Sequence, residues 1–394
     1  MTGAKNRLLI VDDEPAICTI IRRVAEPLGF QVKSLNQSGE FLQTVREFRP
    51  SLLILDLKMP GSDGVQLLQQ LKQGHSDAQV IVISGMDQRV LNTAEKLGRS
   101  RGLKMIGVLQ KPLQRAELEL RLNEALSTNR VYSRAELTSA LAESQFVVHY
   151  QPKITRNSKG WKVDGAEALV RWMHPAHGLL PPSEFLEQVE EYRLIDELTD
   201  FVLETAVRQA AEWNARNLPI RVAVNLSATL IQDLDFPDRL ATLLEKYGVD
   251  GSLLAVELTE STAMADATKA MDIFLRLCVN DISLSIDDFG TGFSSLQQLY
   301  QLPFNELKID RMFVGGLPDD DEARAIVRAT VDMAHALNIK VCAEGVETRS
   351  ALEYLESVNC DRAQGYLVSP AVAAAEFEHI VSNWNSSTDG GRAD

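Results

Sequence analysis

The chain has 394 residues, of which 45% are hydrophobic and 24% are charged, and its formal net charge is −15 at pH 7. This length and composition indicate two soluble domains with apolar cores, and they exclude a disordered chain. Because the chain is acidic and has neither a long apolar stretch nor a signal-peptide core, we expect it to be cytoplasmic, with no membrane and no nucleic acid among its partners.

Short apolar runs alternate with amphipathic segments over residues 1–126. The runs are 8–12, 31–35, 52–56, 79–84 and 105–109. Strand-length runs separated by helical segments predict a parallel sheet with helices on both faces. We therefore expect an α/β domain of the flavodoxin-like (βα)5 type over this part of the chain.

A helical linker is predicted over residues 127–145. Ser133 and Glu136 have the spacing of a capping box, which would open a helix that continues to about Ser144.

The remainder of the chain begins with a hairpin pattern and continues as alternating strands and helices. Apolar runs at 146–154 and 161–169 flank a turn signal at 157–160. The alternation over residues 146–384 suits a (β/α)8 TIM-like barrel. The tail, 385–394, is rich in Ser, Gly and Asp, so we expect it to be disordered.

Chemically active side chains follow four of the five N-terminal strands. They are Asp12 and Asp13 after the first, Asp56 at the end of the third, Ser84 at the end of the fourth and Lys111 after the fifth. The carboxyl ends of parallel strands meet at one edge, where such sheets bind ligands. Clustered carboxylates favour a bound cation, here Mg²⁺, with Asp56 as a phosphoryl-accepting nucleophile and Lys111 as its counter-charge. The alternative is that Asp12 and Asp13 only cap the helix that begins at Pro15.

The first domain resembles the receiver domain of bacterial response regulators across about 120 residues, through Val11–Pro15, Leu55–Gly61 and Gln110–Pro112. The resemblance implies that Asp13, Asp56 and the Lys58 carbonyl hold Mg²⁺ with help from Asp12. It also implies that Ser84 is the switch hydroxyl and that a sensor histidine kinase is the partner. Val108 departs from the family, which commonly has a rotating Tyr or Phe there.

In the second domain, carboxylate or amide side chains recur at the ends of predicted strands. They are Glu167, Asn225, Glu257, Asp287, Asp288 and Glu344. Barrel enzymes place their chemistry at the carboxyl ends of strands. Oxygen ligands without His or Cys select Mg²⁺ or Mn²⁺, and two such ions are a standard arrangement for phosphodiester hydrolysis. The alternative is that each is a solvated strand end or a helix cap.

Two local features bear on the hypothesis of a two-metal site. The glycines at 290 and 292 would let the backbone bend, so that Asp287 and Asp288 could serve two metal sites. Lys308 ends its own predicted strand on the same rim, where it could orient the attacking water or stabilise the phosphate. The alternative for Lys308 is an ordinary lysine that extends its ammonium to solvent.

The second domain resembles the EAL-type cyclic di-GMP phosphodiesterase domain over nearly the whole barrel. The matching motifs are Tyr150–Pro152, Glu167–Trp172, Val224–Ser227, Glu257–Ser261, Asp287–Leu296, Leu307–Asp310, Ala343–Thr348 and Gln364–Leu367. The stretch after Leu367 lacks the basic residue that the family usually has before Pro370, which bears on a substrate-side contact and not on the metal site.

The resemblance assigns roles residue by residue. The first metal would be bound by Glu167, Asn225, Glu257 and Asp287. The second metal or its waters would be held by Asp287, Asp288 and Glu344. Lys308 would position the nucleophilic water, and Glu347 and Gln364 would line the same pocket. Gln151 and Arg171 would contact the nucleotide. Glu260 would anchor the loop after Asp288. Glu167, Lys308 and Glu344 would be the catalytic residues.

The sequence thus predicts a response regulator that hydrolyses cyclic di-GMP to linear pGpG, is regulated by phosphorylation of Asp56 and forms a dimer or larger homo-oligomer. Two alternatives stay open. One is a non-catalytic cyclic di-GMP receptor, and the other is an interaction protein in which the barrel is incidental.

Overall fold

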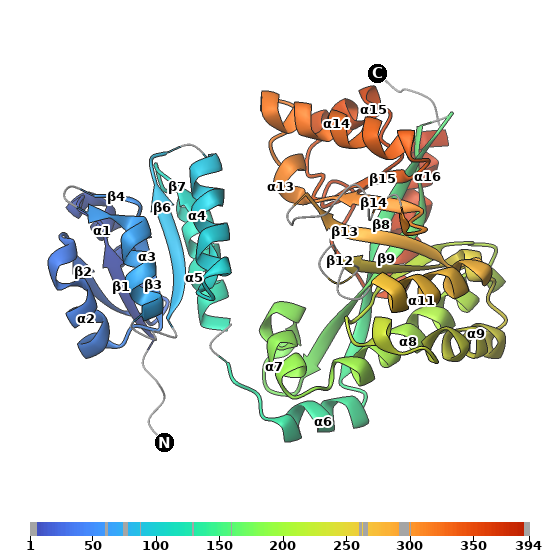
Figure 1. Ribbon diagram of the computed structural model, residues 1–394, viewed down its shortest axis with the longest axis horizontal. Helices are drawn as coiled ribbons and strands as arrows, with labels where there is room; N and C mark the ends of the chain where they lie inside the picture. The colour runs from blue at the N-terminus through green and yellow to red at the C-terminus, as the bar shows by residue number, and fades with distance from the viewer. Residues whose placement is uncertain are drawn as a thin grey trace. The chain divides into compact units, whose positions relative to one another are not determined.

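The computed structural model describes residues 6–59, 62–73, 78–86, 88–127, 130–158, 160–259, 262, 267–290, 299 and 301–389. The chain forms two compact units, Met1–Tyr132 and Ser133–Asp394 (Figure 1). The division falls within the segment 127–145 that the sequence analysis assigns to a linker. None of the described helices has the length and apolar content needed to cross a lipid bilayer.

The first unit is a five-stranded parallel sheet in the order β2-β1-β3-β6-β7. Its strands are β1 (Arg7–Val11), β2 (Gln31–Leu35), β3 (Leu52–Asp56), β6 (Gln79–Ser84) and β7 (Lys104–Gln110). A two-stranded pair of β4 (Lys58–Met59) and β5 (Ser62–Asp63) follows β3. Every residue of β3 and β6 is buried, because helices cover both faces of the sheet.

Two apolar clusters hold the helices on the sheet. Ile21 of α1 (Pro15–Ala25) and Leu122 of α5 (Arg115–Ser127) are buried on one face. The other face packs against α2 (Phe41–Phe48), α3 (Gly64–Gln73) and α4 (Gln88–Ser100), which contribute Phe41, Leu68 and Leu91. The predicted flavodoxin-like fold is confirmed (Figure 1).

The second unit is a closed barrel of eight strands. Its order is β9-β11-β12-β13-β14-β15-β16-β8, and β8 also pairs with β9. The bounds are β8 (Phe146–Asn157), β9 (Gly160–His174), β11 (Arg221–Asn225), β12 (Leu254–Thr259), β13 (Ser283–Phe289), β14 (Glu306–Ile309), β15 (Lys340–Ala343) and β16 (Arg362–Gln364). The predicted barrel is confirmed, with one strand reversed: β8 is antiparallel to both neighbours, as the hairpin signal at 157–160 requires.

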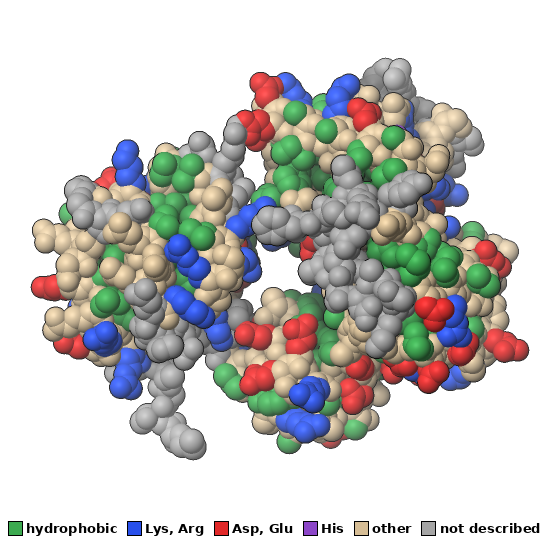
Figure 2. Space-filling model, viewed as in Figure 1, with side chains coloured by type: hydrophobic (Ala, Val, Ile, Leu, Met, Phe, Trp, Pro, Cys, Tyr) green, Lys and Arg blue, Asp and Glu red, His purple; other side chains and the backbone are tan. Residues whose placement is uncertain are grey.

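Helices surround the barrel, and a short strand, β10 (Gly178–Leu180), pairs with β9 outside it. The helices are α7 (Leu186–Glu191), α8 (Ile195–Ala215), α9 (Phe236–Tyr247), α11 (Ala267–Val279), α13 (Arg311–Val314), α14 (Asp321–Ala336), α15 (Arg349–Ser357) and α16 (Ala374–Asp389). Acidic side chains gather on the visible face of this unit around α8 and α9 (Figure 2), in keeping with the acidic net charge.

The second unit begins with α6 (Arg134–Ala142). The Ser133 hydroxyl accepts a hydrogen bond from the Glu136 backbone N–H, and the Glu136 carboxylate accepts one from the Ser133 N–H, so the expected capping box is present.

The expectation of a disordered tail is wrong for Asn385–Asp389, which continue α16. The Asn385 side chain accepts a hydrogen bond from the Val163 N–H at 2.8 Å and donates one to the Val163 carbonyl at 3.3 Å. Trp384 Nε1 donates to the Trp161 carbonyl at 3.1 Å. These bonds to β9 stabilise a segment whose composition alone indicates disorder, while residues 390–394 lie outside the described part of the chain.

Gly365 follows β16 at the point where the chain crosses the segment after β15. Any Cβ at Gly365 would overlap the backbone of Val346, which bonds to Gln364 and Leu367 on either side of the glycine. Gly165 of β9 is less crowded, since its Cβ would meet nothing closer than the Arg221 carbonyl at 3.3 Å.

We expect Gly365→Ala to lower the free energy of unfolding of the barrel by about 1–3 kcal/mol, because two backbone segments must move apart. Urea unfolding followed by tryptophan fluorescence measures this in the full chain, because all four tryptophans (Trp161, Trp172, Trp213 and Trp384) lie in the second unit. Gly165→Ala is the matched control. Equal losses in both variants would contradict the packing argument.

Candidate functional sites

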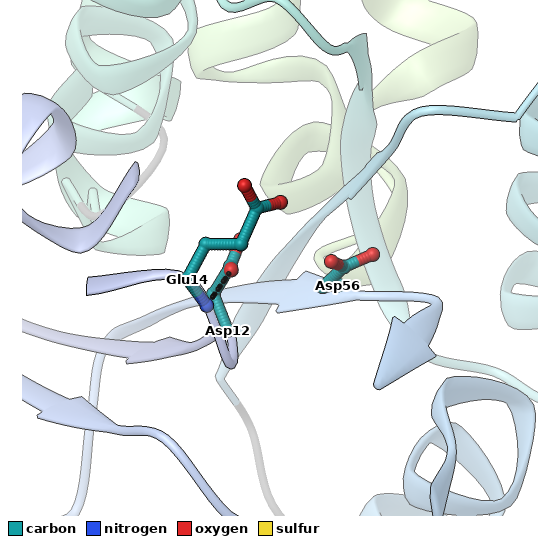
Figure 3. Close-up of side chains that lie close together, drawn as sticks. All are labelled: Asp12, Glu14 and Asp56. Carbon is teal, nitrogen blue, oxygen red and sulfur yellow. Dashed lines mark hydrogen bonds between the residues drawn. The ribbon is translucent and has the colours of Figure 1, made fainter. Parts of the chain in front are cut away.

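One acidic cluster lies at the carboxyl edge of the first unit's sheet. Asp12 follows β1, Asp56 ends β3, and both are buried, while Glu14 is exposed. Oxygen atoms of these three carboxylates lie within 4.8 Å of one another. The Glu14 backbone N–H donates to the Asp12 carboxylate at 2.8 Å, and Asp56 lies beside them (Figure 3).

Lys111 bridges this cluster from the end of β7. Its Nζ lies 2.7 Å from Asp56 Oδ2, 2.8 Å from Glu14 Oε1 and 3.0 Å from Asp12 Oδ2. Burial lowers the pKa of Lys111, but the hydrogen bonds to the three carboxylates outweigh burial and raise it above its ordinary value. Burial also raises the pKa of Asp12. The structure thus brings Asp12, Asp56 and Lys111 together, as the strand-end argument predicts.

The other residues expected in the receiver site are Ser84, Lys58 and Asp13. Ser84 is buried at the end of β6, and its hydroxyl accepts from the Met86 N–H at 3.2 Å. The Lys58 N–H donates to Asp56 Oδ1 at 3.0 Å. Asp13 is not in the described cluster, which contains Glu14 instead. Glu14 was not predicted as a site residue, although it directly follows two aspartates.

Val108 occupies the position, three residues before Lys111, where receiver domains commonly have Tyr or Phe. Val108 is buried in the cluster that packs α2, α3 and α4 on the sheet. Two residues on, the Gln110 side chain donates to the Met86 carbonyl at 3.1 Å. This bond links the end of β7 to the loop after Ser84.

In the barrel, the carboxylates expected at the strand ends form two groups that share one residue. The first is Glu167 of β9, Glu257 of β12 and Asp287 of β13, and the second is Asp287, Asp288 and Glu344, which follows β15. Glu167 lies within β9, which continues to His174, and not at its end as expected. Within each group the carboxylate oxygens lie within 4.8 Å of one another. Convergence of parallel strands in a barrel accounts for this grouping.

Lys308 of β14 lies among both groups and is completely buried. Its Nζ is 2.6 Å from Glu344 Oε1, 2.7 Å from Glu257 Oε2 and 3.0 Å from Asp287 Oδ2, and it is 3.6 Å from Glu167 Oε2. Burial lowers the pKa of Lys308, but the surrounding carboxylates raise it well above its ordinary value. The alternative of a lysine that extends to solvent is therefore wrong.

Two amides orient Glu167. Asn225, the last residue of β11, donates to Glu167 Oε1 at 2.8 Å, and Gln364 of β16 donates to Oε2 at 2.7 Å. Burial raises the pKa of Glu167, but Lys308, Lys153 and these bonds outweigh it and hold the pKa at about 2. The surroundings of Glu167 therefore favour its ionised form. Because the Asn225 nitrogen donates to Glu167, its oxygen is left available as a ligand atom.

The backbone bends at Asp288, and the carboxylates of Asp287 and Asp288 lie in one group, although adjacent side chains on a regular strand point to opposite faces. Asp288 has a left-handed φ of 56°, and the register between β13 and β14 shifts between Ile286 and Phe289. A bend was expected at the glycines after the acidic pair, but it already begins at Asp288, the second residue of the pair. Burial, with Asp287 and Asp310 nearby, raises the pKa of Asp288 to about 6. Burial also raises the pKa of Glu344 to about 8.

The expected nucleotide contacts lie around Glu167. Gln364 also donates to Gln151 Oε1 at 2.9 Å, and Gln151 donates to the Ser369 carbonyl at 3.3 Å. The segment without the usual basic residue therefore contributes its backbone here. Arg171 is partly buried, with a bond to the Val170 carbonyl, and Glu347 is exposed. Glu260 and the loop residues 291–298 lie outside the described residues.

The barrel donors fit hard divalent cations. They are oxygen atoms without a histidine or cysteine, and carboxylates predominate, which is the ligand chemistry of Mg²⁺ and Mn²⁺. Within the part of the chain that the structure describes, the buried Gln364 Oε1 accepts no hydrogen bond although it lies beside Glu167. An unpaired buried oxygen in a polar site is consistent with a ligand there.

On the described barrel strands, three buried charged residues were not predicted: Lys153 of β8, Glu306 of β14 and Arg362 of β16. They lie beneath the strand-end carboxylates, and Lys153 binds Glu257 directly. The available signal was the period of two along β8, which puts Lys153 on the same face as Gln151.

Comparison with known proteins finds relatives of both units. A model of the EAL domain matches residues 134–371, and a model of the response regulator receiver domain matches residues 8–123. The bifunctional diguanylate cyclase/cyclic di-GMP phosphodiesterase MucR of Pseudomonas aeruginosa is 40% identical over 243 residues, which are 61% of this chain and 35% of MucR. The cyclic di-GMP phosphodiesterase PdeR of Escherichia coli is 37% identical over 242 residues, 61% of this chain and 36% of PdeR.

Solved structures agree with these matches. The PaMucR phosphodiesterase in its c-di-GMP complex superposes with a TM-score of 0.58 at 40% identity, covering 62% of this chain and 98% of that one. The EAL enzyme Bd1971 in its cAMP and cyclic-di-GMP bound form gives 0.59 at 27% identity, covering 81% and 80%. The chain spans about a third of the length of the two curated relatives. It belongs to the EAL domain family and carries a response regulator receiver domain before the EAL domain.

Proposed function

We propose that the barrel hydrolyses cyclic di-GMP to linear pGpG with two divalent cations, Mg²⁺ or Mn²⁺. The observation that carries this proposal is the pair of carboxylate groups that share Asp287 and surround the Lys308 ammonium. The substrate is inferred from MucR and PdeR, which are named as cyclic di-GMP phosphodiesterases. None of the metal ligands expected from the family is substituted in this chain, which argues against a non-catalytic receptor.

The chain would hold the cations with Glu167, Asn225, Glu257 and Asp287 at one position and with Asp287, Asp288 and Glu344 at the other. Two cations would stabilise the attacking and leaving oxygens of the phosphodiester and supply hydroxide from water near neutral pH. The oxygen of Asn225 is presented by the bond from its nitrogen to Glu167. The bend at Asp288 lets neighbouring side chains serve different positions.

Lys308 would position the nucleophilic water and stabilise charge on the phosphate. Its ammonium is fully buried and held by carboxylates on three sides, so its direction is fixed before the substrate binds. A preorganised cation in a site shielded from water stabilises developing negative charge strongly. Gln151 and Arg171, at the margin of Glu167, would contact the nucleotide.

Glu167→Gln and Asp287→Asn should each lower the turnover of cyclic di-GMP by at least about 100-fold, because each removes a charge from a site that selects cations by carboxylates. The assay measures pGpG by chromatography with the full-length protein in excess Mg²⁺ or Mn²⁺. Glu204→Gln, a change of the same kind on an exposed residue of α8, is the matched control.

Turnover within tenfold of wild type in both site variants would contradict the metal assignment. A wild-type protein that binds cyclic di-GMP without forming pGpG would be a receptor, as the first alternative states. A protein that does neither would favour the interaction protein.

We further propose that a sensor histidine kinase phosphorylates Asp56 and thereby regulates the barrel. The nucleophilic carboxylate is buried beside Lys111 and the carboxylates of Asp12 and Glu14, the surroundings expected of a phosphoacceptor with bound Mg²⁺. A phosphoryl group adds negative charge and acceptor oxygens, which would draw Lys111 and Ser84 inward. The bond from Gln110 to the Met86 carbonyl offers a path from Ser84 to β7 that does not require an aromatic side chain at Val108.

A small-molecule phosphodonor should change the rate of cyclic di-GMP hydrolysis by about fivefold or more, which is the lower range of typical allosteric coupling. The comparison uses wild type and Asp56→Asn, each with and without the donor. The change should be present in wild type and absent in the variant. Equal rates in all four conditions would show that phosphorylation does not regulate hydrolysis.

A further inference from the structure

A second layer of charges fills the barrel interior beneath Glu257. It consists of Lys153, Glu306 and Arg362, which come from β8, β14 and β16 and are 2%, 7% and 6% exposed. Charged side chains are rarely buried to this extent unless each is paired. Their contacts form a continuous chain of alternating sign that ends at Glu257.

Each carboxylate oxygen of Glu257 is held by a different lysine. Oε2 accepts from Lys308 at 2.7 Å, on the side of the strand-end carboxylates, and Oε1 accepts from Lys153, on the inner side. Glu257 is completely buried. With each oxygen bound to a different lysine, the carboxylate plane cannot rotate without breaking one of these bonds.

Lys153 is itself held from below. Glu306 Oε1 lies 4.0 Å from Lys153 Nζ and accepts from the Ser285 hydroxyl at 3.3 Å. Glu306 Oε2 accepts from Arg362 at 2.9 Å. The ammonium therefore has a carboxylate on each side, and the lower one is anchored by two further strands.

Lys153 lies opposite Gly165 across the β8–β9 hairpin. A Cβ at Gly165 would lie 3.5 Å from the Lys153 Cβ, which is an ordinary van der Waals contact. A register shift follows directly at Ile154. Because side chains alternate along a strand, Lys153 occupies the inward position one step deeper than Gln151.

An apolar side chain at this position would fill the same space without the cost of burying an ammonium, so packing alone does not account for Lys153. Partners outside the ligand shell commonly orient the ligands of metal sites, and their loss typically weakens metal affinity about 10–100-fold. The bond to Glu257 Oε1 has that geometry with respect to the group formed by Glu167, Glu257 and Asp287.

We propose that Lys153 is a positioning residue for metal binding: it fixes the Glu257 carboxylate so that its outer oxygen faces Glu167 and Asp287. The inference rests on the proposed function in that it requires this group to bind a divalent cation. Glu306 and Arg362 support Lys153 from below.

The test measures Mn²⁺ binding to the full-length protein without nucleotide, using the EPR signal of free Mn²⁺. Lys153→Met removes the charge and the donor while keeping the length of the side chain. It should weaken one class of Mn²⁺ site by about 10–100-fold. Lys162→Met, the same change on an exposed position of β9, is the matched control and should bind as wild type does.

The direction of the effect separates this role from a simple charge effect. A lysine that only repels cations would, on removal, strengthen Mn²⁺ binding, and a lysine that only stabilises the fold would leave the affinity unchanged; either result overturns the proposal. Tryptophan fluorescence reports whether the barrel is folded. Should Lys153→Met not fold, Lys153→Gln, which keeps a donor, takes its place and should also lose affinity.

Failure of the inference can be told from failure of the proposed function. Wild type that binds Mn²⁺ with the affinity of Lys153→Met leaves metal-dependent hydrolysis intact and removes the role of Lys153. Wild type that binds no Mn²⁺ would contradict both.

Discussion

The buried ammonium of Lys308 is the interaction on which the barrel site depends. It contacts carboxylates from β9, β12 and β13 and from the segment after β15, so one cation ties together residues spread over most of the barrel. Among the described residues of the site, five carboxyl groups face two ammonium groups, those of Lys308 and Lys153. Like charges at this separation repel, and divalent cations at the strand ends would relieve that repulsion.

The two acidic sites of the chain, one in the receiver sheet and one in the barrel, are built in the same way. In each, parallel strands deliver carboxylates to one edge, and a lysine from a neighbouring strand binds several of them. The receiver lysine is partly exposed, which is compatible with the proposed phosphorylation of Asp56 beside it. The barrel lysine is enclosed, which fixes its direction and suits a catalytic rather than an accepting role.

Strand periodicity and strand-end carboxylates were enough to predict both folds and most of the acidic residues that meet. Lys153, Glu306 and Arg362 were missed because site residues were sought at the ends of strands. Each lies two residues from a predicted site residue (Gln151, Lys308 and Gln364) and therefore on the same face of its strand. The ordering of Asn385 depends on bonds to Val163, 222 residues away. Such long-range pairings cannot be read from local composition. The bend at Asp288 likewise comes from its place between β13 and β14 and not from the glycines alone.

The most direct test of the central claim is a crystal structure of the protein grown with Mn²⁺, with the anomalous signal of manganese used to locate the ions. The account predicts two peaks in the barrel, one among Glu167, Glu257 and Asp287 and one among Asp287, Asp288 and Glu344, with Lys308 beside both. A single peak that Asp287 does not contact, or manganese bound only outside the barrel, would contradict it.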